Sequence, residues 1–509
     1  MNNHSVQDSL MAGKGICDIT RRDVGAIQGD VAIRASLGLD KQEGIRIHDP
    51  LFARALVLDN GDTRVAILSM DVIAIGGIYE VPDSFLPEVR ARIESELGIP
   101  GARVLVNASH THLVGGQLCD DLVERAADAV RQACAAMRPV TVRAGKGSET
   151  RITMNRRIRI KDGSAWTERH ANPSPPDHEV AGVGPIDPDV GVLRLDTPDG
   201  SPFALVYAFT AHPYCGASGG GVTAELPGFA SSVIDRTLGE GFLSLFLQGA
   251  AGDITEVRYK DVNHPRNSEP LGMMLALSTL DAWRGAAPCR NTLRVLSETI
   301  QVPRRTDIPC RIRELEEEQQ RLLDSLAGTS LNFKSFLPLL MKYTLNPEYP
   351  SDYAYWYMHQ KQMGETDLPT LDAENRANID KYLRNIYAME KLARIQTNLR
   401  VLREREKINR EADSTTLPIE VQVMRVGDFA LVTFPGELFV EVGLNIKRAS
   451  PFKNTFIAAY SNGYVHYAPT KAAVGQGDYE DVNCLMAPEW QELYEHKALE
   501  LLRRIAEAN

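Results

Sequence analysis

The sequence predicts a mixed α/β protein in which a sheet-based catalytic body is interrupted by a helical insertion. Over residues 1–304, short β-branched or apolar runs alternate with helical patterns, and glycine and proline separate them, which is typical of α/β layers. Residues 305–416 instead carry long charged stretches with apolar residues at three- and four-residue steps, a helical pattern. Strand-like runs return over 417–509, so we expect the body to be discontinuous in sequence.

In the first part of the body, the apolar runs at 64–70 and 103–108 predict strands, and residues 81–97 between them have helical spacing. Glycine and proline at 98–100 predict the end of that helix. After the insertion, the runs at 419–426 and 429–434 predict two further strands.

Two stretches predict helices in the insertion. Residues 311–326 place leucines on one face of a charged helix, and residues 379–402 repeat isoleucine and leucine until 414–418 break the pattern. We interpret them as a helical pair with a coiled-coil-like scaffolding role rather than a catalytic one. The aromatic residues of 349–359 could line a substrate entrance, but packing of the pair onto the body is the favoured interpretation.

Composition excludes several classes of protein. The 509 residues are 43% hydrophobic and 24% charged, the profile of an ordinary soluble globular protein. The 56 Lys and Arg against 67 Asp and Glu give a net charge of −11 without a basic patch, so we expect no binding to nucleic acid or anionic membranes. No apolar run reaches the roughly 18 residues of a membrane span, and we identify no amphipathic membrane-binding stretch. We expect a small-molecule or lipid-like substrate as partner and no stable membrane insertion.

The cysteines and the N-terminal residues predict a compartment. The seven cysteines are odd in number, which leaves at least one thiol unpaired, and they form no C-x-x-C pair. The first residues lack a basic segment followed by an apolar one, so we do not expect a secretory signal. These observations predict a reducing, cytoplasmic location.

Five strand-like runs end in segments that can bind a metal or move protons, and active sites of α/β proteins gather at strand ends. Two histidines, a carboxylate and one further oxygen form a donor set suited to catalytic zinc. Each segment also has a structural explanation, such as hydrogen-bonded histidines, a tight glycine turn or a carboxylate favoured at a helix N-terminus. The candidates are His110 and His112, His212, Asp253 and Thr255, Glu437, and the phenols of Tyr464, Tyr467 and Tyr479.

Several short motifs also occur in order along most of the chain: Gly13-Lys-Gly-Ile-Cys-Asp-Ile-Thr, Leu51-Phe-Ala-Arg-Ala-Leu-Val-Leu, Ser109-His-Thr-His, Asn155-Arg, Ala211-His-Pro, Ala251-Gly-Asp-Ile, Phe434-Pro-Gly-Glu, Tyr467 and Tyr479-Glu. With these motifs the sequence resembles the neutral/alkaline, non-lysosomal ceramidases. Members of that family are zinc amidases that cleave the acyl chain from sphingoid bases. Several motifs in the same order along the chain indicate a family far more specifically than any single motif does.

The resemblance implies roles for eight residues. It implies four ligands for Zn²⁺: His110, His212, Glu437 and Tyr467. It further implies that His112 and Arg156 hold the scissile carbonyl, that Tyr479 assists from the opposite side, and that Thr255 takes the position of the family's serine. In that family a zinc-bound water attacks the amide carbonyl, and the metal and neighbouring donors stabilise the oxyanion.

The chain also departs from the family pattern. Residues 113–115 read Leu-Val-Gly where the family has Ser-Gly-Pro. Only 30 residues follow Tyr479, so we expect the immunoglobulin-like C-terminal domain of the ceramidases to be missing, as is their secretory signal. We therefore expect a zinc-dependent hydrolase of an N-acyl amide whose substrate differs from ceramide in its contacts.

Three other interpretations stay open. The same metal-binding fold could act on an ester or a carbohydrate linkage, because one fold hosts many reactions. Gly216-Ala-Ser-Gly-Gly matches G-x-S-x-G and would make Ser218 a nucleophile, but the required strand–turn–helix context is not evident. A non-catalytic binding protein is disfavoured, because every ligand position is filled.

Overall fold

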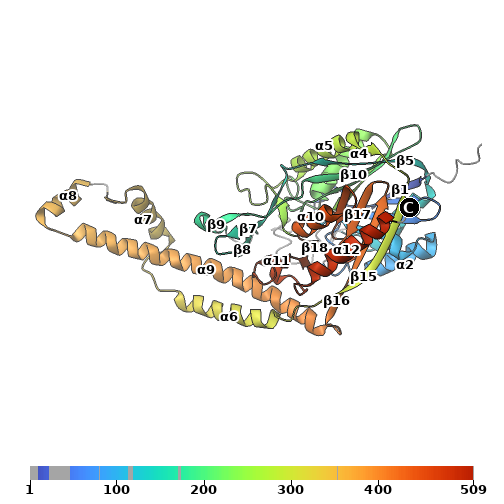
Figure 1. The fold of residues 1–509 in the computed structure, drawn as a ribbon. Coiled ribbons are helices and arrows are strands. Elements are labelled where there is room, and N and C mark those ends of the chain that lie inside the picture. The colour runs from blue at the N-terminus through green and yellow to red at the C-terminus, as the bar shows by residue number, and fades with distance from the viewer. Residues whose placement is uncertain are drawn as a thin grey trace, which may run out of the picture. The chain divides into compact units, whose positions relative to one another are not determined.

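The computed structural model describes residues 10–21, 46–78, 81–112, 118–169, 174–351 and 354–507. These residues belong to two compact units (Figure 1). The first contains the described parts of Met1–Glu168, Pro175–Arg305 and Glu411–Asn509, and the second consists mainly of Thr306–Arg410. The sequence departure at 113–115 lies outside the described residues.

A nine-stranded mixed sheet forms the framework of the first unit. Its order is β12 (Leu243–Gln248), β11 (Pro202–Phe209), β10 (Asp189–Asp196), β5 (Arg138–Ser148), β1 (Leu10–Asp18), β2 (Phe52–Asp59), β3 (Arg64–Met70) and β4 (Val104–Ala108), with β14 (Ala287–Pro288) beside β5. The outermost pairs, β3–β4 and β11–β12, are parallel, and the other pairs are antiparallel. The predicted mixed α/β class is confirmed.

Helices connect the two parallel pairs. The helix α2 (Phe85–Leu97) links β3 to β4 and buries Phe85, Val89 and Ile93, one residue per turn. It ends at Gly98, whose φ of 67° is the left-handed conformation common after a helix. The helix predicted over 81–97 therefore begins four residues later than expected, because Val81 forms a β-bridge with Ile78. The second crossover helix is α4 (Glu225–Leu238), between β11 and β12.

The glycines of the first motif allow a helix to lie directly on the sheet. The helix α3 (Leu122–Ala135) packs on β1 and β2. A Cβ atom at Gly13 would lie 1.9 Å from the carbonyl oxygen of Ala133, and one at Gly15 would lie 2.1 Å from that of Ala129. Any larger residue would push the helix off the strand, so these positions require glycine.

The two ends of the long sheet meet through β12, which contacts β2, β3 and β4. Gln248 at the end of β12 fixes this junction. Its backbone N–H donates to Asn107 Oδ1 (2.9 Å), its Nε2 donates to the carbonyl of Ser109 (3.0 Å), and its Oε1 accepts from Ala211 N (3.1 Å). Because Ser109 precedes His110 and Ala211 precedes His212, one buried amide holds both histidine-bearing segments together.

A second sheet lies where the chain leaves and re-enters the first unit. It has the order β15 (Leu293–Pro303), β16 (Thr416–Val426), β17 (Phe429–Thr433) and β19 (Asn454–Ala458). In the antiparallel pair β15–β16, Pro303 lies opposite Thr416, so the two ends of the helical insertion are neighbours. The predicted strands at 419–426 and 429–434 correspond to β16 and β17.

Three smaller sheets and the remaining helices complete the first unit. The small sheets pair β13 (Ile254–Glu256) with β6 (Thr153–Asn155), β18 (Glu437–Leu438) with β20 (Tyr467–Ala468), and β7 (Arg157–Ile160) with β8 (Ala165–Thr167) and β9 (Val180–Val183). The other helices are α5 (Glu269–Gly285), α10 (Val440–Ala449), α11 (Tyr479–Val482) and α12 (Trp490–Glu507).

The second unit contains α6 (Ile308–Ser325), α7 (Phe333–Leu345), α8 (Ala354–Met363) and the long helix α9 (Asp367–Glu411), orange in Figure 1. The two predicted helical stretches lie in α6 and α9, which are joined by an ion pair of 2.7 Å between Arg403 and Glu316. The helix α7 packs on α9 through Phe336, Tyr343 and Ile379.

Two features bear on partners. No helix within the described ranges is both long and apolar enough to cross a membrane. Among the aromatic residues of 349–359, Tyr357 is buried within the second unit, where its hydroxyl donates to Asp372, whereas Tyr355 and Trp356 are 64% and 55% exposed.

Candidate metal centre

Three histidines converge where the ends of the long sheet meet. His110 and His112 follow β4, and His212 follows β11. Nε2 of His112 lies 3.2 Å from Nε2 of His110 and 3.1 Å from Nε2 of His212. Nitrogen atoms of all three lie within 4.8 Å of one another, so one metal ion could contact them together. His110 and His212 are buried, and His112 is partly exposed.

Hydrogen bonds on the far side of two rings set the direction of their lone pairs. His110 Nδ1 lies 2.6 Å from the carbonyl oxygen of Ile73, and His212 Nδ1 lies 3.2 Å from that of Ala251. A carbonyl only accepts, so in each neutral ring the proton is on Nδ1 and the lone pair is on Nε2. Two lone pairs cannot bond to each other, and their convergence fits a cation. The same use of Nδ1 orients histidines at metal sites.

A carboxylate adjoins the histidines. Glu437 Oε2 lies 3.5 Å from His110 Nε2 and makes no hydrogen bond within the described chain, whereas Oε1 accepts one of 2.6 Å from the Tyr464 hydroxyl. Burial favours protonation of Glu437, but the neighbouring His110 and Arg156 outweigh it and lower the pKa. An ionised, buried oxygen with a free lone pair beside a histidine nitrogen adds a hard donor to the site.

Pairing of the short strands β18 and β20 brings Tyr467 opposite Glu437. The Tyr467 hydroxyl accepts a hydrogen bond of 3.0 Å from Arg156 Nη2, which also donates 2.9 Å to the carbonyl of Gly252. Arg156 Nε donates 2.9 Å to Glu480. The remaining nitrogen, Nη1, makes no hydrogen bond among the described residues, so it is available to a ligand.

The other predicted site residues lie around this group. The Tyr479 ring, partly exposed, stands 5.4 Å from the Tyr467 ring. Thr255 in β13 is buried, and its hydroxyl has no partner in the described part of the chain. Asp253 instead accepts from Asn155 Nδ2 (2.7 Å) and from the backbone of Val440 (2.8 Å), so it holds the start of α10.

Two buried carboxyl groups escaped the sequence analysis. Glu225 accepts hydrogen bonds from His112 N (2.8 Å), the Thr111 hydroxyl (2.9 Å) and Gly216 N (2.9 Å). Glu256 accepts from the backbone of Tyr214 and Cys215, which follow His212. Burial and the proximity of the two groups raise the pKa of Glu225 to about 8. No local pattern marks either residue, because their partners are distant in sequence.

Several residues with a strained backbone conformation lie at or near the histidine cluster. Left-handed φ angles occur at His110 (65°), Glu225 (52°), Tyr460 (55°) and His466 (63°), where glycine or asparagine would be ordinary. The Tyr460 ring centroid lies 4.1 Å from that of His110. Each such residue costs about 1–3 kcal/mol and persists only where surrounding contacts fix it, as at active sites.

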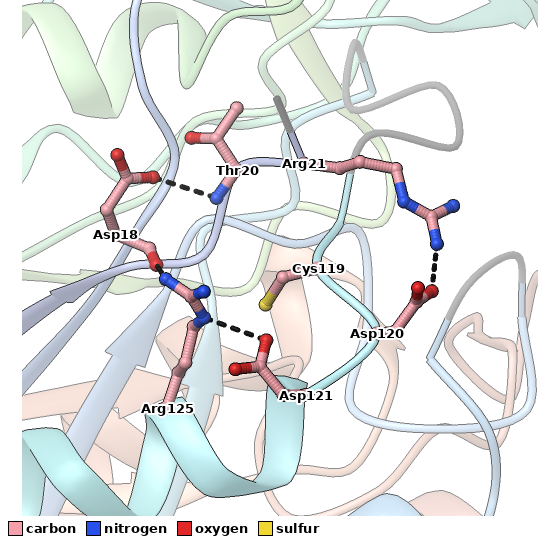
Figure 2. Close-up of a pocket in the computed structure, with 7 residues that line it drawn as sticks. All are labelled: Asp18, Thr20, Arg21, Cys119, Asp120, Asp121 and Arg125. Atoms are coloured by element: carbon pink, nitrogen blue, oxygen red, sulfur yellow. Dashed lines mark hydrogen bonds and ion pairs between the residues drawn. The ribbon is translucent and has the colours of Figure 1, made fainter. Parts of the chain in front are cut away.

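Two other candidate sites lack these features. Ser218 is exposed, and nine residues separate it from the end of β11, so the strand–turn–helix elbow of a serine hydrolase is not formed there. A cavity of about 530 Å³ also lies in the first unit, and Figure 2 shows the residues that line it. Its charged lining groups are already paired, Arg125 with Asp121 at 2.8 Å and Arg21 with Asp120. We assign no chemistry to it.

Comparison with known proteins identifies similar folds. No protein-family model and no curated protein matches the chain. Among solved structures, neutral ceramidase from Pseudomonas aeruginosa is 19% identical with a TM-score of 0.60, covering 98% of this chain and 75% of that one. A ceramidase complexed with C2 is 18% identical with a TM-score of 0.60, covering 98% and 76%. The resemblance seen in the sequence motifs is thus confirmed at the level of structure, and the chain has the fold of the neutral ceramidases.

Proposed function

We propose that this protein is a zinc-dependent hydrolase that cleaves the amide bond of an N-acyl substrate. The observation that carries the proposal is the convergence of the His110, His112 and His212 Nε2 atoms beside the unpartnered Glu437 Oε2. The likeness of fold to proteins named as ceramidases supports the choice of an amide. Nitrogen and oxygen donors without thiolate are typical of catalytic zinc.

In this proposal His110, His212, Glu437 and Tyr467 would hold zinc. When bound there, zinc would supply Lewis acidity and lower the pKa of a water molecule. The ligands come from four separate segments, so their geometry depends on the hydrogen bonds that fix each segment, those of Gln248 and Glu225 among them.

The neighbouring side chains position and stabilise the reacting carbonyl. Arg156 is fixed by Glu480 and Gly252, and its unoccupied Nη1 is the donor we assign to the carbonyl oxygen as negative charge develops there. His112, partly exposed, acts on the same oxygen, and Tyr479 donates to the leaving group from the opposite side. Thr255 would contribute its buried hydroxyl, which has no partner in the described part of the chain.

Elemental analysis of protein purified without chelators tests the metal. We expect near-stoichiometric zinc in the wild type and loss of that zinc in Glu437→Ala. A matched control is Glu441→Ala, at an exposed position of α10, which should keep the metal. A well-folded wild type that takes up no metal even when zinc is supplied would overturn the proposed mechanism.

A substrate screen tests the bond. We expect turnover of N-acyl amides and, at most, slower turnover of esters and glycosides. If no amide is turned over but an ester or a glycoside is, the proposal of an amide substrate is wrong and the enzyme cleaves that other bond. Insensitivity to a fluorophosphonate probe is expected, because Ser218 is not the nucleophile.

A further inference from the structure

The second unit exposes an unusual amount of apolar surface. Of the 21 large hydrophobic side chains exposed in the described part of the chain, nine lie between Phe333 and Leu371. Six of them lie on two helices, and we term these six side chains the α7–α8 surface: Phe333, Leu337, Met341 and Leu345 on α7, and Tyr355 and Trp356 on α8. Apolar surface gathered in this way marks a site of interaction.

On α7 the exposed residues form one row. They recur every fourth residue, so they lie above one another along the helix, and they are 65%, 43%, 54% and 70% exposed. The opposite side of α7 is also apolar, since Phe336 and Tyr343 pack on Ile379 of α9. No amphipathic membrane-binding stretch is evident from the sequence, because apolar residues lie on both sides of α7. Only the packing on α9 reveals which side stays exposed.

Buried polar contacts hold both helices in place. Asp372 in α9 accepts hydrogen bonds from the hydroxyls of Tyr343 in α7 (2.7 Å) and Tyr357 in α8 (2.6 Å). The Asn332 side chain caps the start of α7 by accepting from Lys334 N and Ser335 N. The exposed apolar residues are therefore presented on anchored helices.

The charge of these helices complements an anionic layer. Within α7 and α8 the only charged residues are Lys334, Lys342 and Lys361, in a chain whose net charge is −11. The acidic residues of this part of the chain lie outside the two helices: Glu348 and Asp352 between α7 and α8, and Glu365, Asp367, Asp372 and Glu374 after α8. Lysines around exposed Trp, Tyr, Phe and Leu are the composition of helices that lie in a membrane interface.

We propose that the α7–α8 surface docks on an anionic lipid membrane, with its aromatic and aliphatic side chains entering the headgroup region and its lysines facing lipid phosphates. A second copy of this chain suits the surface less well. In a two-fold contact the same patches would meet, which would bring lysine against lysine. Docking leaves the proposed reaction untouched, since neither the surface nor its test involves the histidine cluster.

Vesicle co-sedimentation tests the proposal. We expect the wild type to bind vesicles of phosphatidylcholine and phosphatidylserine in equal parts more tightly than vesicles of phosphatidylcholine alone. The double variant Phe333→Ser/Trp356→Ser should bind about a hundredfold more weakly, roughly tenfold for each side chain. Leu277→Ser is the matched control, because Leu277 is 62% exposed on α5 in the first unit, and it should bind like the wild type.

Two further measurements make the test decisive. Tryptophan emission should shift to the blue when anionic vesicles are added, and the shift should vanish in Trp356→Phe. Lys334→Gln/Lys342→Gln should reduce the preference for phosphatidylserine, by about fivefold for each lysine.

Several results would overturn the proposal. One is a wild type that sediments with neither kind of vesicle, and another is a double variant that binds as the wild type does. Light scattering that shows a dimer without lipid, dissociated by the double substitution, would assign the surface to a second copy. A large fall in the free energy of unfolding of the double variant would show that these side chains pack against another part of the same chain and are not free to dock on a membrane. None of these readouts requires turnover, so they are distinguishable from failure of the proposed reaction.

Discussion

Replacing Glu225 should uncouple the histidine segments, and it offers a quantitative test of how the site is built. The carboxyl group is fully buried and accepts hydrogen bonds from His112 N, the Thr111 hydroxyl and Gly216 N. In Glu225→Ala the Thr111 hydroxyl keeps the carbonyl of Thr223 as an acceptor (2.8 Å), whereas His112 N and Gly216 N lose theirs. At about 1–2 kcal/mol for each of these two donors, the free energy of unfolding should fall by about 2–4 kcal/mol.

Backbone strain supplies an internal control. Glu225 has a φ of 52°, which costs about 1 kcal/mol in any residue with a Cβ atom and nothing in glycine. Glu225→Gly loses the same three hydrogen bonds but relieves this strain, so it should be more stable than Glu225→Ala by about 1 kcal/mol. Glu240→Ala, at an exposed position beyond the end of α4, should change stability by less than about 0.5 kcal/mol.

Urea denaturation followed by circular dichroism measures these differences, and competition with a chromophoric chelator measures zinc affinity. Because Glu225 fixes the backbone of His112, which the proposed function assigns to the carbonyl and not to zinc, we expect both variants to keep zinc and to turn over substrate more slowly. A Glu225→Ala protein as stable as the wild type, or more stable than Glu225→Gly, would refute the reasoning.

Three further predictions concern the site and its surroundings. His110→Ala should lose zinc and activity together, whereas His112→Ala should keep zinc and lose rate; elemental analysis showing the opposite would reverse the assignment of ligands. Arg156→Lys should keep the metal but lower kcat about 10- to 100-fold, because lysine cannot donate at once to Glu480, Tyr467 and a carbonyl; unchanged kcat would remove Arg156 from the reaction. Burial raises the pKa of Asp71 to about 6 against an ordinary 3.8, so the native state holds its proton more tightly and stability falls as pH rises through this interval. Asp71→Asn should abolish up to about 3 kcal/mol of that fall, and a pH–stability curve unchanged by the substitution would contradict it.

Local patterns in the sequence indicated much of the candidate metal centre. His110 and His112 stand in one motif after a strand-like run, and a proline marks the strand end at His212, so both segments could be found without a structure. The positions of Glu437 and Tyr467 came from ordered motifs. Their meeting depends on the parallel pairing of two strands of only two residues each, for which the sequence has no periodicity to detect.

The supporting residues could not be predicted in this way. Glu225 and Gln248 appear as an acidic residue at a helix start and an amide at a strand end, both common in any α/β protein. Their importance arises from contacts across 113 residues between Glu225 and His112, and across 139 residues between Gln248 and Ser109. Such contacts exist only once the ends of the long sheet have met.

The sequence by itself determined the α/β class, the helical character of the insertion and the set of donors suited to a metal. It could do so because helix and strand periodicities, turn residues and side-chain chemistry are local properties of the chain. Only the tertiary structure decided that the Nε2 atoms of three histidines lie close together, that buried carboxyl groups hold their loops, and which face of α7 remains exposed. These depend on pairing between distant segments, and on packing that turns each side chain toward a neighbour or toward solvent.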